Sequence, residues 1–218
     1  MSERSNTASP RLTRRRMLAG GGAAALAATT TLLAPSRGET AVHCTPFDWQ
    51  GVQFCEAGIP SNIAGQSARP QYQSQWCWAA CIAMIFSYYG HPVRQERIVS
   101  ETFGSIVNMP AHPMHILSAV NRPWVDDNRR GFRSQGQALL IDAEVAAQHL
   151  IDEHPLIIGS LGHATVLTAM SWAQDTMGRQ ELTGLVVRDP WYGGQRRQLS
   201  GQEIYATDFL ALVVAQGG

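Results

Sequence analysis

The sequence contains no lysine, and its 17 basic residues are unevenly distributed along the chain. Six of these arginines precede Gly38, whereas only one of the 17 acidic residues, Glu3, does so. Residues 38–218 therefore carry 11 arginines against 16 acidic residues, a net charge of −5. Because nucleic-acid binders present an excess of positive charge to the phosphates, we expect no nucleic-acid partner.

The N-terminal apolar run, residues 18–34, is shorter than the roughly 20 residues that a membrane-spanning helix needs. It is rich in glycine, alanine and threonine and follows an arginine cluster at residues 14–16. That order is typical of a secretory signal, and residues 13–18 resemble the twin-arginine export signal. We expect residues 1–37 to be such a signal, with export to the periplasm or outside the cell by the twin-arginine machinery and no stable membrane anchoring after cleavage. An uncleaved membrane anchor is the alternative.

Cysteine is scarce, with four residues that all lie between positions 44 and 81. No two of them form a CxxC pair, so a zinc site is only a weak alternative. Cys77 and Cys81 would lie one helical turn apart, which is poor geometry for a disulfide. Cys44 and Cys55 flank a short loop that a disulfide could close. For an exported protein we therefore predict one disulfide, Cys44–Cys55, and two free thiols.

Internal repeats and low-complexity segments are absent after the predicted signal. The remaining length, residues 38–218, suits one domain. Residues 41–75 are rich in Gly, Pro, Ser, Asn and Gln, which predicts an extended, loop-like lead that is either a short propeptide or part of the fold. Helical patterns follow, at residues 78–89, 93–104, 113–123 and, after the N-cap residue Asp142, 144–154.

Short β-branched and apolar runs dominate the C-terminal half, at residues 155–160, 163–174, 182–190 and 209–215. Residues 175–181 predict a turn between the second and third of these runs, residues 124–135 predict a loop or edge hairpin, and Ser200–Glu203 fits a capping box. Helices followed by strands indicate an α+β fold: an N-terminal helical layer packed on a C-terminal antiparallel sheet, with a site in the groove between them.

The stretch Trp76-Cys77-Trp78 begins the first predicted helix. A cysteine in a first helical turn lies where unpaired N–H groups and the helix dipole favour an anion. That position lowers the thiol pKa and raises the reactive thiolate fraction. Cys77 is therefore either a buried small residue or a nucleophile, and a nucleophile also needs a base and an orienting group.

Two downstream residues supply these groups. His163 begins one predicted strand and Asp189 ends the next strand of the same hairpin. One antiparallel strand starts where its neighbour stops, so the two side chains are expected to lie close together. Asp189 could then hold the imidazole tautomer, as in a catalytic triad.

The order Gln71, Trp76-Cys77-Trp78, Gly162-His163-Ala164 and Asp189-Pro190-Trp191 resembles the papain-like cysteine peptidase superfamily. The resemblance extends from about residue 71 to the C-terminus, and is to compact bacterial forms related to leader-processing peptidases and plant-pathogen effector proteases. It implies a papain-like fold in which the cysteine opens the central helix and the histidine opens a strand.

The resemblance also implies roles for individual residues. Cys77 would be the nucleophile, His163 the general base and acid, and Asp189 the orienting group. Gln71, six residues before the cysteine, would donate to the oxyanion together with the Cys77 backbone N–H, although Gln73 and Gln75 compete for this role. We expect Trp76 and Trp191 to form walls of the substrate groove and Trp78 to lie in the core.

The chain departs from papain in its Cys-to-His interval of 86 residues, against roughly 130–150 in papain and the cathepsins. An aspartate also replaces the third, asparagine member. We expect an exported cysteine peptidase that acts on protein or peptide substrates as a monomer, without metal or cofactor. A transglutaminase-like acyl transferase, a cell-wall amidase with the same triad, and an inactive peptide-binding module are the alternatives.

Overall fold

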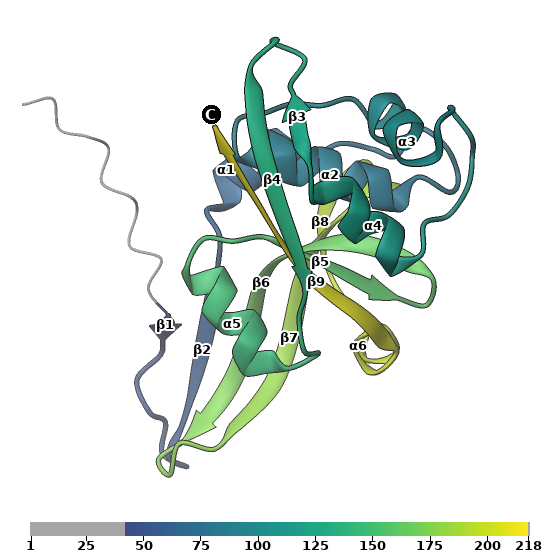
Figure 1. Ribbon diagram of the computed structural model, residues 1–218. Helices are drawn as coiled ribbons and strands as arrows, with labels where there is room; N and C mark the ends of the chain where they lie inside the picture. The colour runs from purple at the N-terminus through teal and green to yellow at the C-terminus, as the bar shows by residue number, and fades with distance from the viewer. Residues whose placement is uncertain (1–41, 218) are drawn as a thin grey trace, which may run out of the picture. The chain divides into compact units, whose positions relative to one another are not determined.

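The computed structural model describes residues 42–217, so the predicted export signal lies outside the described residues. Figure 1 shows a group of helices beside one large sheet. Within residues 42–217, no helix is long and apolar enough to cross a membrane. The helices are α1 (Ser61–Ser67), α2 (Cys77–Tyr88), α3 (Gln95–Phe103), α4 (Pro113–Val120), α5 (Ala143–Ile151), α6 (Gly201–Tyr205) and the 3-10 turn η1 (Pro190–Tyr192).

All the strands in the described range belong to one antiparallel sheet with the order β1-β2-β6-β5-β9-β4-β3, to which β7 is added on β6 and β8 on β7. The strands are β1 (His43–Cys44), β2 (Val52–Gly58), β3 (Pro123–Val125), β4 (Gly131–Ala138), β5 (Leu156–Ser160), β6 (His163–Asp175), β7 (Gln180–Asp189), β8 (Gln195–Gln198) and β9 (Thr207–Gly217).

The long strand β6 organises the sheet. Its first residues pair with β5, its second half pairs with β2, and β7 runs along its other side. The predicted turn at residues 175–181 does connect β6 to β7 as a hairpin. The two ends of that hairpin, His163 and Asp189, therefore come to the same end of the sheet.

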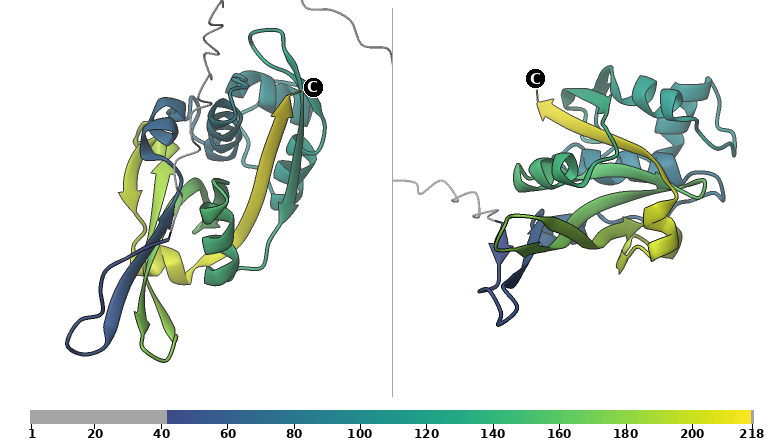
Figure 2. Two further views of the ribbon diagram at one scale, coloured as in Figure 1. Left: turned by 90° about the vertical axis from the view of Figure 1, so that its left-hand side faces the viewer. Right: turned by 90° about the horizontal axis from the view of Figure 1, so that it is seen from below.

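The two faces of the sheet cover separate hydrophobic cores. Helices α2, α3 and α4 pack against one face, and α5 packs against the other. Figure 2 shows α5 apart from the α2–α4 group. Along β5, Ile157 faces the first core while Leu156 and Ile158 face the second. Burial on both faces explains why this strand is an unbroken apolar run.

The predicted fold class is confirmed: the protein is α+β, with the helices α2–α4 against an antiparallel sheet. Helix α2 is buried around most of its circumference, and Gly90, whose φ is +82°, follows its end. The hairpin β3–β4 lies at the sheet edge, and Asp142 caps α5 through the backbone N–H groups of residues 144 and 145.

The loop-like lead predicted for residues 41–75 is wrong in part, because it contains strand β2 and helix α1. Along β2, Cys55 and Ala57 are buried while Phe54 and Glu56 are exposed. This alternation is the period of a strand, but the buried residues are small, so it gives only a weak apolar pattern. The segment is part of the sheet, with Cys55 opposite Trp172 of β6.

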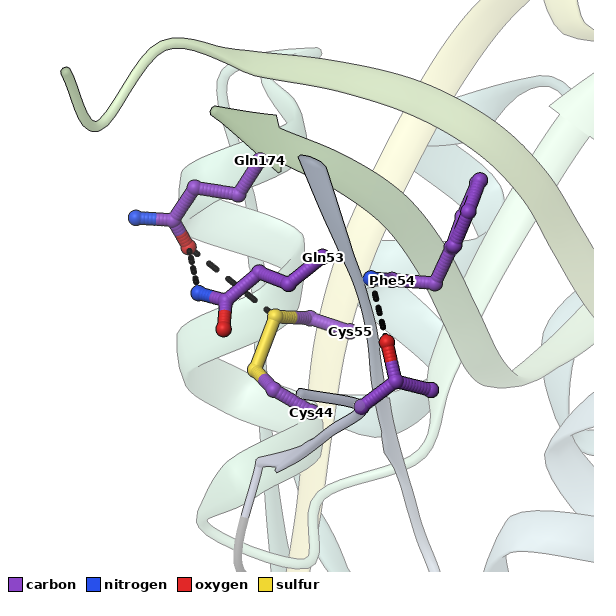
Figure 3. The surroundings of a disulfide bond; sticks show 6 residues. Cys44, Gln53, Phe54, Cys55 and Gln174 are labelled. Carbon is purple, nitrogen blue, oxygen red and sulfur yellow. Dashed lines mark hydrogen bonds between the residues drawn. A yellow bond between two sulfur atoms is a disulfide. The ribbon is translucent and has the colours of Figure 1, made fainter. Parts of the chain in front are cut away.

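The predicted disulfide Cys44–Cys55 is present, and Cys77 and Cys81 are free. Figure 3 shows that the disulfide joins the short strand β1 to β2 at the edge of the sheet. Beside it, the Gln53 side-chain amide donates to Gln174 Oε1 at 3.5 Å, which links β2 to β6. The disulfide therefore fixes the outermost strand pair.

Candidate active site

Cys77 is the first residue of α2. The N-cap residue, Trp76, makes no side-chain cap, and the first turn contains no acidic side chain. No cap side chain and no acidic residue of this turn therefore competes for its backbone N–H groups, and the positive end of the helix dipole lies beside the half-buried thiol.

His163 is the first residue of β6, directly after a two-residue turn that connects it to β5. The turn residues Leu161 and Gly162 have φ values of +53° and +74°. Positive φ at both positions matches the tight turns that suit the twist of a β-hairpin. Ser160 and His163 are paired across this turn, so the turn sets the position of the imidazole at the sheet end.

Asp189 ends β7 and lies 2.8 Å, Oδ1 to Nε2, from His163. Its side chain is 1% exposed, while that of His163 is 28% exposed. The same Oδ1 accepts a hydrogen bond from the Trp191 backbone N–H at 2.9 Å. The histidine is therefore held through Nε2, which leaves Nδ1 as the ring nitrogen available to the cysteine.

The thiol of Cys77 interacts with the His163 imidazole, and the pKa values of both groups shift. Burial raises the pKa of Cys77, but the hydrogen bond with His163 and the N–H groups of Ala164 and Trp78 outweigh burial, so the thiol pKa is lowered. Burial lowers the pKa of His163, but the bonds to Asp189 and Cys77 raise it to about 9. Both shifts favour a thiolate–imidazolium pair.

A cavity of about 120 Å³ opens beside this pair. Cys77 and His163 lie on its wall, together with Ser160 of β5 and Asp208 of β9. The rest of the wall is mainly apolar and comes from α2, the segment before α4, α4 and the sheet: Trp78, Pro110, Ala111, Pro113, Ile116, Ala164 and Phe209. The thiol therefore faces a pocket between the helical group and the sheet, where the groove was predicted.

Gln71 lies in the segment that leads to α2. Its side-chain Nε2 donates to the carbonyl oxygens of Gln73 and Ser74, at 2.9 and 3.0 Å. Its Oε1 is buried and has no hydrogen-bond partner among the described residues. The amide predicted to serve an oxyanion is thus engaged with its own loop in this structure.

The sequence itself places the chain in a family. The model of the Peptidase_C39 like family matches residues 64–213, which include Cys77, His163 and Asp189. The chain belongs to the Peptidase_C39 like family. It is accordingly a member of the papain-like cysteine peptidase superfamily, as the sequence motifs indicated.

Two solved structures are similar to this family member at low identity. One is the peptidase domain of Streptococcus ComA, a bi-functional ABC transporter involved in a quorum sensing pathway, with 15% identity, a TM-score of 0.46, and coverage of 69% of this chain and 98% of that one. The other is UfSP from C. elegans, with 14% identity, a TM-score of 0.43, and coverage of 81% of this chain and 34% of that one. No curated protein matches the sequence.

Of the two tryptophans that flank the cysteine, Trp76 does not lie where the prediction placed it. Trp76 is 2% exposed and belongs to the core, where its indole N–H donates to the Val107 carbonyl at 2.8 Å. Trp78 lies in the core, as predicted, and also lines the cavity beside Cys77. Trp191 is 60% exposed, two residues after Asp189. Trp76 is thus a core residue, because its N–H is satisfied inside the protein, and Trp191 remains accessible.

Sequence reasoning missed two polar residues near the site. Gln95 lies at the start of α3 and is 2% exposed. Its side chain accepts a hydrogen bond from the Tyr72 N–H and donates one to the Pro70 carbonyl, so it holds the backbone on both sides of Gln71. Arg197 of β8 donates from Nε to Asp189 Oδ2 at 2.7 Å. Gln95 was predicted only as part of the helix at residues 93–104, and Arg197 lies in a polar stretch without apolar periodicity.

The histidine pair His112 and His115 forms the cap of α4. His112 Nδ1 accepts from the Met114 N–H, and His115 Nδ1 accepts from the His112 N–H. Among the described residues no group of His, Cys, Asp and Glu side chains is arranged to hold a metal ion.

Proposed function

We propose that the protein is an exported cysteine peptidase that hydrolyses peptide bonds through Cys77, His163 and Asp189. The observation that carries the proposal is the hydrogen bond from His163 Nε2 to the buried Asp189 carboxylate. It fixes the imidazole with its other nitrogen toward a thiol at a helix N-terminus. Membership of a cysteine peptidase family supports the same reaction class.

In the proposed reaction, the Cys77 thiolate attacks the carbonyl carbon of the scissile peptide bond. The carbonyl electrons move onto oxygen, and the tetrahedral species collapses as the C–N bond breaks. The His163 imidazolium gives its proton to the leaving amine, which leaves a thioester on Cys77. Neutral His163 then takes a proton from water, the hydroxide adds to the thioester, and the C–S bond breaks to restore the thiolate.

The oxyanion would be stabilised by the backbone N–H of Cys77 and by Gln71. Because both Gln71 amide hydrogens are engaged with loop carbonyls, Gln71 must give up one of these bonds to donate to the substrate. We expect Gln71→Ala to lower kcat by about 10²-fold, measured on a peptide substrate. A loss of thermal stability with kcat unchanged would make Gln71 a loop residue only.

The proposed substrate is a protein or peptide that places a side chain in the mainly apolar cavity beside Cys77. The chemistry needs only water as co-reactant, and we propose neither a metal nor a cofactor. An acyl transferase would follow the same steps up to the thioester, with an amine in place of water. Incorporation of a labelled amine into casein, measured beside casein hydrolysis, separates the two reactions.

The direct test compares hydrolysis of a peptide library by the wild-type residues 38–218 with hydrolysis by Cys77→Ala and His163→Ala. Both variants are expected to lose hydrolysis while keeping the wild-type circular dichroism spectrum, because neither side chain belongs to the buried core. Cys81→Ala is the matched control, since this thiol is completely buried one turn further along α2. Undiminished hydrolysis by Cys77→Ala would exclude the proposal.

Export by the twin-arginine route is part of the proposal, and the disulfide Cys44–Cys55 is compatible with it. Replacing Arg14 and Arg15 by lysine keeps the charge but removes the twin-arginine pair. We expect the variant chain to stay in the cytoplasm, as fractionation and immunoblotting would show. Normal export of the lysine variant would argue for another route.

A further inference from the structure

Arg197 lies next to the candidate triad but outside the cavity. The register of β8 on β7 pairs Arg197 with Val187 and Gln195 with Asp189. From this position the Arg197 Nε donates to Asp189 Oδ2, while Oδ1 accepts from His163. The two oxygens of the buried carboxylate are thus divided between the histidine and the arginine.

Glu203 of α6 holds the other end of the guanidinium. Arg197 Nη1 and Nη2 donate to the two Glu203 oxygens at 3.1 and 2.7 Å, which is a bidentate pair. Glu203 itself accepts from the Ser200 N–H at 2.8 Å in the capping box of α6. The hydrogen bond with Arg197 lowers the pKa of Glu203 to about 2. The arginine is therefore held on both sides, with the ring of Tyr192 6.0 Å from its Cζ.

We infer that Arg197, anchored by Glu203, is a positioning residue that holds the Asp189 carboxylate in the orientation in which Oδ1 binds His163. The inference rests on the proposed function, because it assigns Arg197 a role in keeping the thiolate–imidazolium pair. Arg197 does not line the cavity beside Cys77, so it acts on the site only through its hydrogen bond to Asp189.

The physical need for such a residue follows from the burial of Asp189. A carboxylate that is 1% exposed is costly to keep charged unless its lone pairs are satisfied. The ionisable groups that interact with it come from three elements: His163 of β6, Arg197 of β8 and the Cys81 thiol of α2. Without Arg197, Oδ2 would lose its charged donor, and the carboxylate would be held through Oδ1 alone, by His163 and the Trp191 N–H.

Three roles for Arg197 predict different effects on His163. If it positions Asp189, its removal weakens the Nε2–Oδ1 bond, and the pKa of His163 falls from about 9 toward its ordinary value. If it acts only as a nearby positive charge, its removal raises the pKa of His163. If it only joins β8 to α6, the pKa stays the same and stability alone declines.

The test is a ¹³C NMR titration of the His163 Cε1–H signal in residues 38–218, assigned by its loss in His163→Ala. In Arg197→Ala we expect the pKa of His163 to fall by about one unit, and kcat to fall about tenfold at unchanged KM. Arg197→Lys, which keeps one charged donor, should recover part of both. Arg196→Ala is the matched control, because Arg196 is a neighbour on β8 that approaches Glu56 and not Asp189.

An unchanged or raised His163 pKa in Arg197→Ala would overturn the inference. If that variant does not fold, Arg197→Lys and Glu203→Gln decide: a lowered pKa in both supports it, and wild-type values overturn it. The titration needs no substrate. A His163 pKa near 6.5 in the wild-type protein would therefore count against the proposed function itself. A raised wild-type pKa that stays the same in Arg197→Ala would count only against the role of Arg197.

Discussion

At the scale of single residues, Cys77 and Cys81 show that position decides the chemistry of a thiol. Both lie on α2, one turn apart. Burial, with the charges of Cys77 and Asp189, raises the pKa of Cys81 well above its usual range. The pKa of Cys77 is lowered because His163 and two backbone N–H groups outweigh its partial burial. Only the first residue of the helix is therefore suited to act as a nucleophile.

The raised pKa of His163 predicts an alkaline limit for hydrolysis. The imidazolium must donate a proton to the leaving amine, so kcat/KM should decline as the pH rises through about 9. A pH series of kcat/KM checks this alkaline limit, and activity that still increases at pH 10 would contradict it.

The same shift affects stability. Because the folded-state pKa of His163 lies above its ordinary value of 6.5, protonated His163 stabilises the fold below pH 6.5, and this contribution is lost as the pH rises through about 9.

At the scale of elements, the long apolar segments were predictable and the polar ones were not. Helix α2 and strands β5, β6 and β9 are apolar runs with Gly, Pro or polar residues at their ends, so length and composition identify them. The order of Cys77 on α2, His163 on β6 and Asp189 at the end of β7 also made the candidate site visible in the sequence.

Strands β2 and β8 were missed for physical reasons. The buried residues of β2 are small, and its pairing with β6 depends on residues more than 110 positions away in the chain. Strand β8 has the sequence Gln-Arg-Arg-Gln, which contains no apolar residue, so only its pairing with β7 defines it. Arg197 lies on this strand, and its approach to Asp189 could not be inferred from sequence spacing.

The packing of α4 on β4 gives a test at the same scale. A Cβ at Gly136 of β4 would lie 2.3 Å from Val120 Cγ2 and 3.3 Å from the Leu212 carbonyl. Gly136→Ala should therefore destabilise the protein by about 1–3 kcal/mol, measured by urea unfolding. Gly131→Ala, in the same strand, is the control, since nothing lies within 4 Å of its Cβ. Equal stabilities of the two variants would contradict this account of the packing.

At the scale of the described molecule, one sheet has a hydrophobic core on each face, and the disulfide joins β1 to β2 at one edge of the sheet. The loop between Cys44 and Cys55 spans 11 positions, so the crosslink should contribute roughly 2–3 kcal/mol by restricting the unfolded chain. The double variant Cys44→Ser, Cys55→Ser should unfold at lower urea concentration with kcat unchanged, because neither cysteine lines the cavity. A loss of kcat in the folded variant would show that the edge strands contribute to the site.

The proposed function requires Cys77 to be an activated nucleophile. The most direct measurement is the labelling of residues 38–218 at neutral pH by a peptide with an electrophilic acyloxymethyl ketone, followed by mass mapping of the modified residue. We expect a single thioether on Cys77, which forms faster than on a free cysteine and more slowly in His163→Ala, and none on Cys81. Labelling of Cys77 no faster than of free cysteine, or to the same extent in His163→Ala, would contradict it.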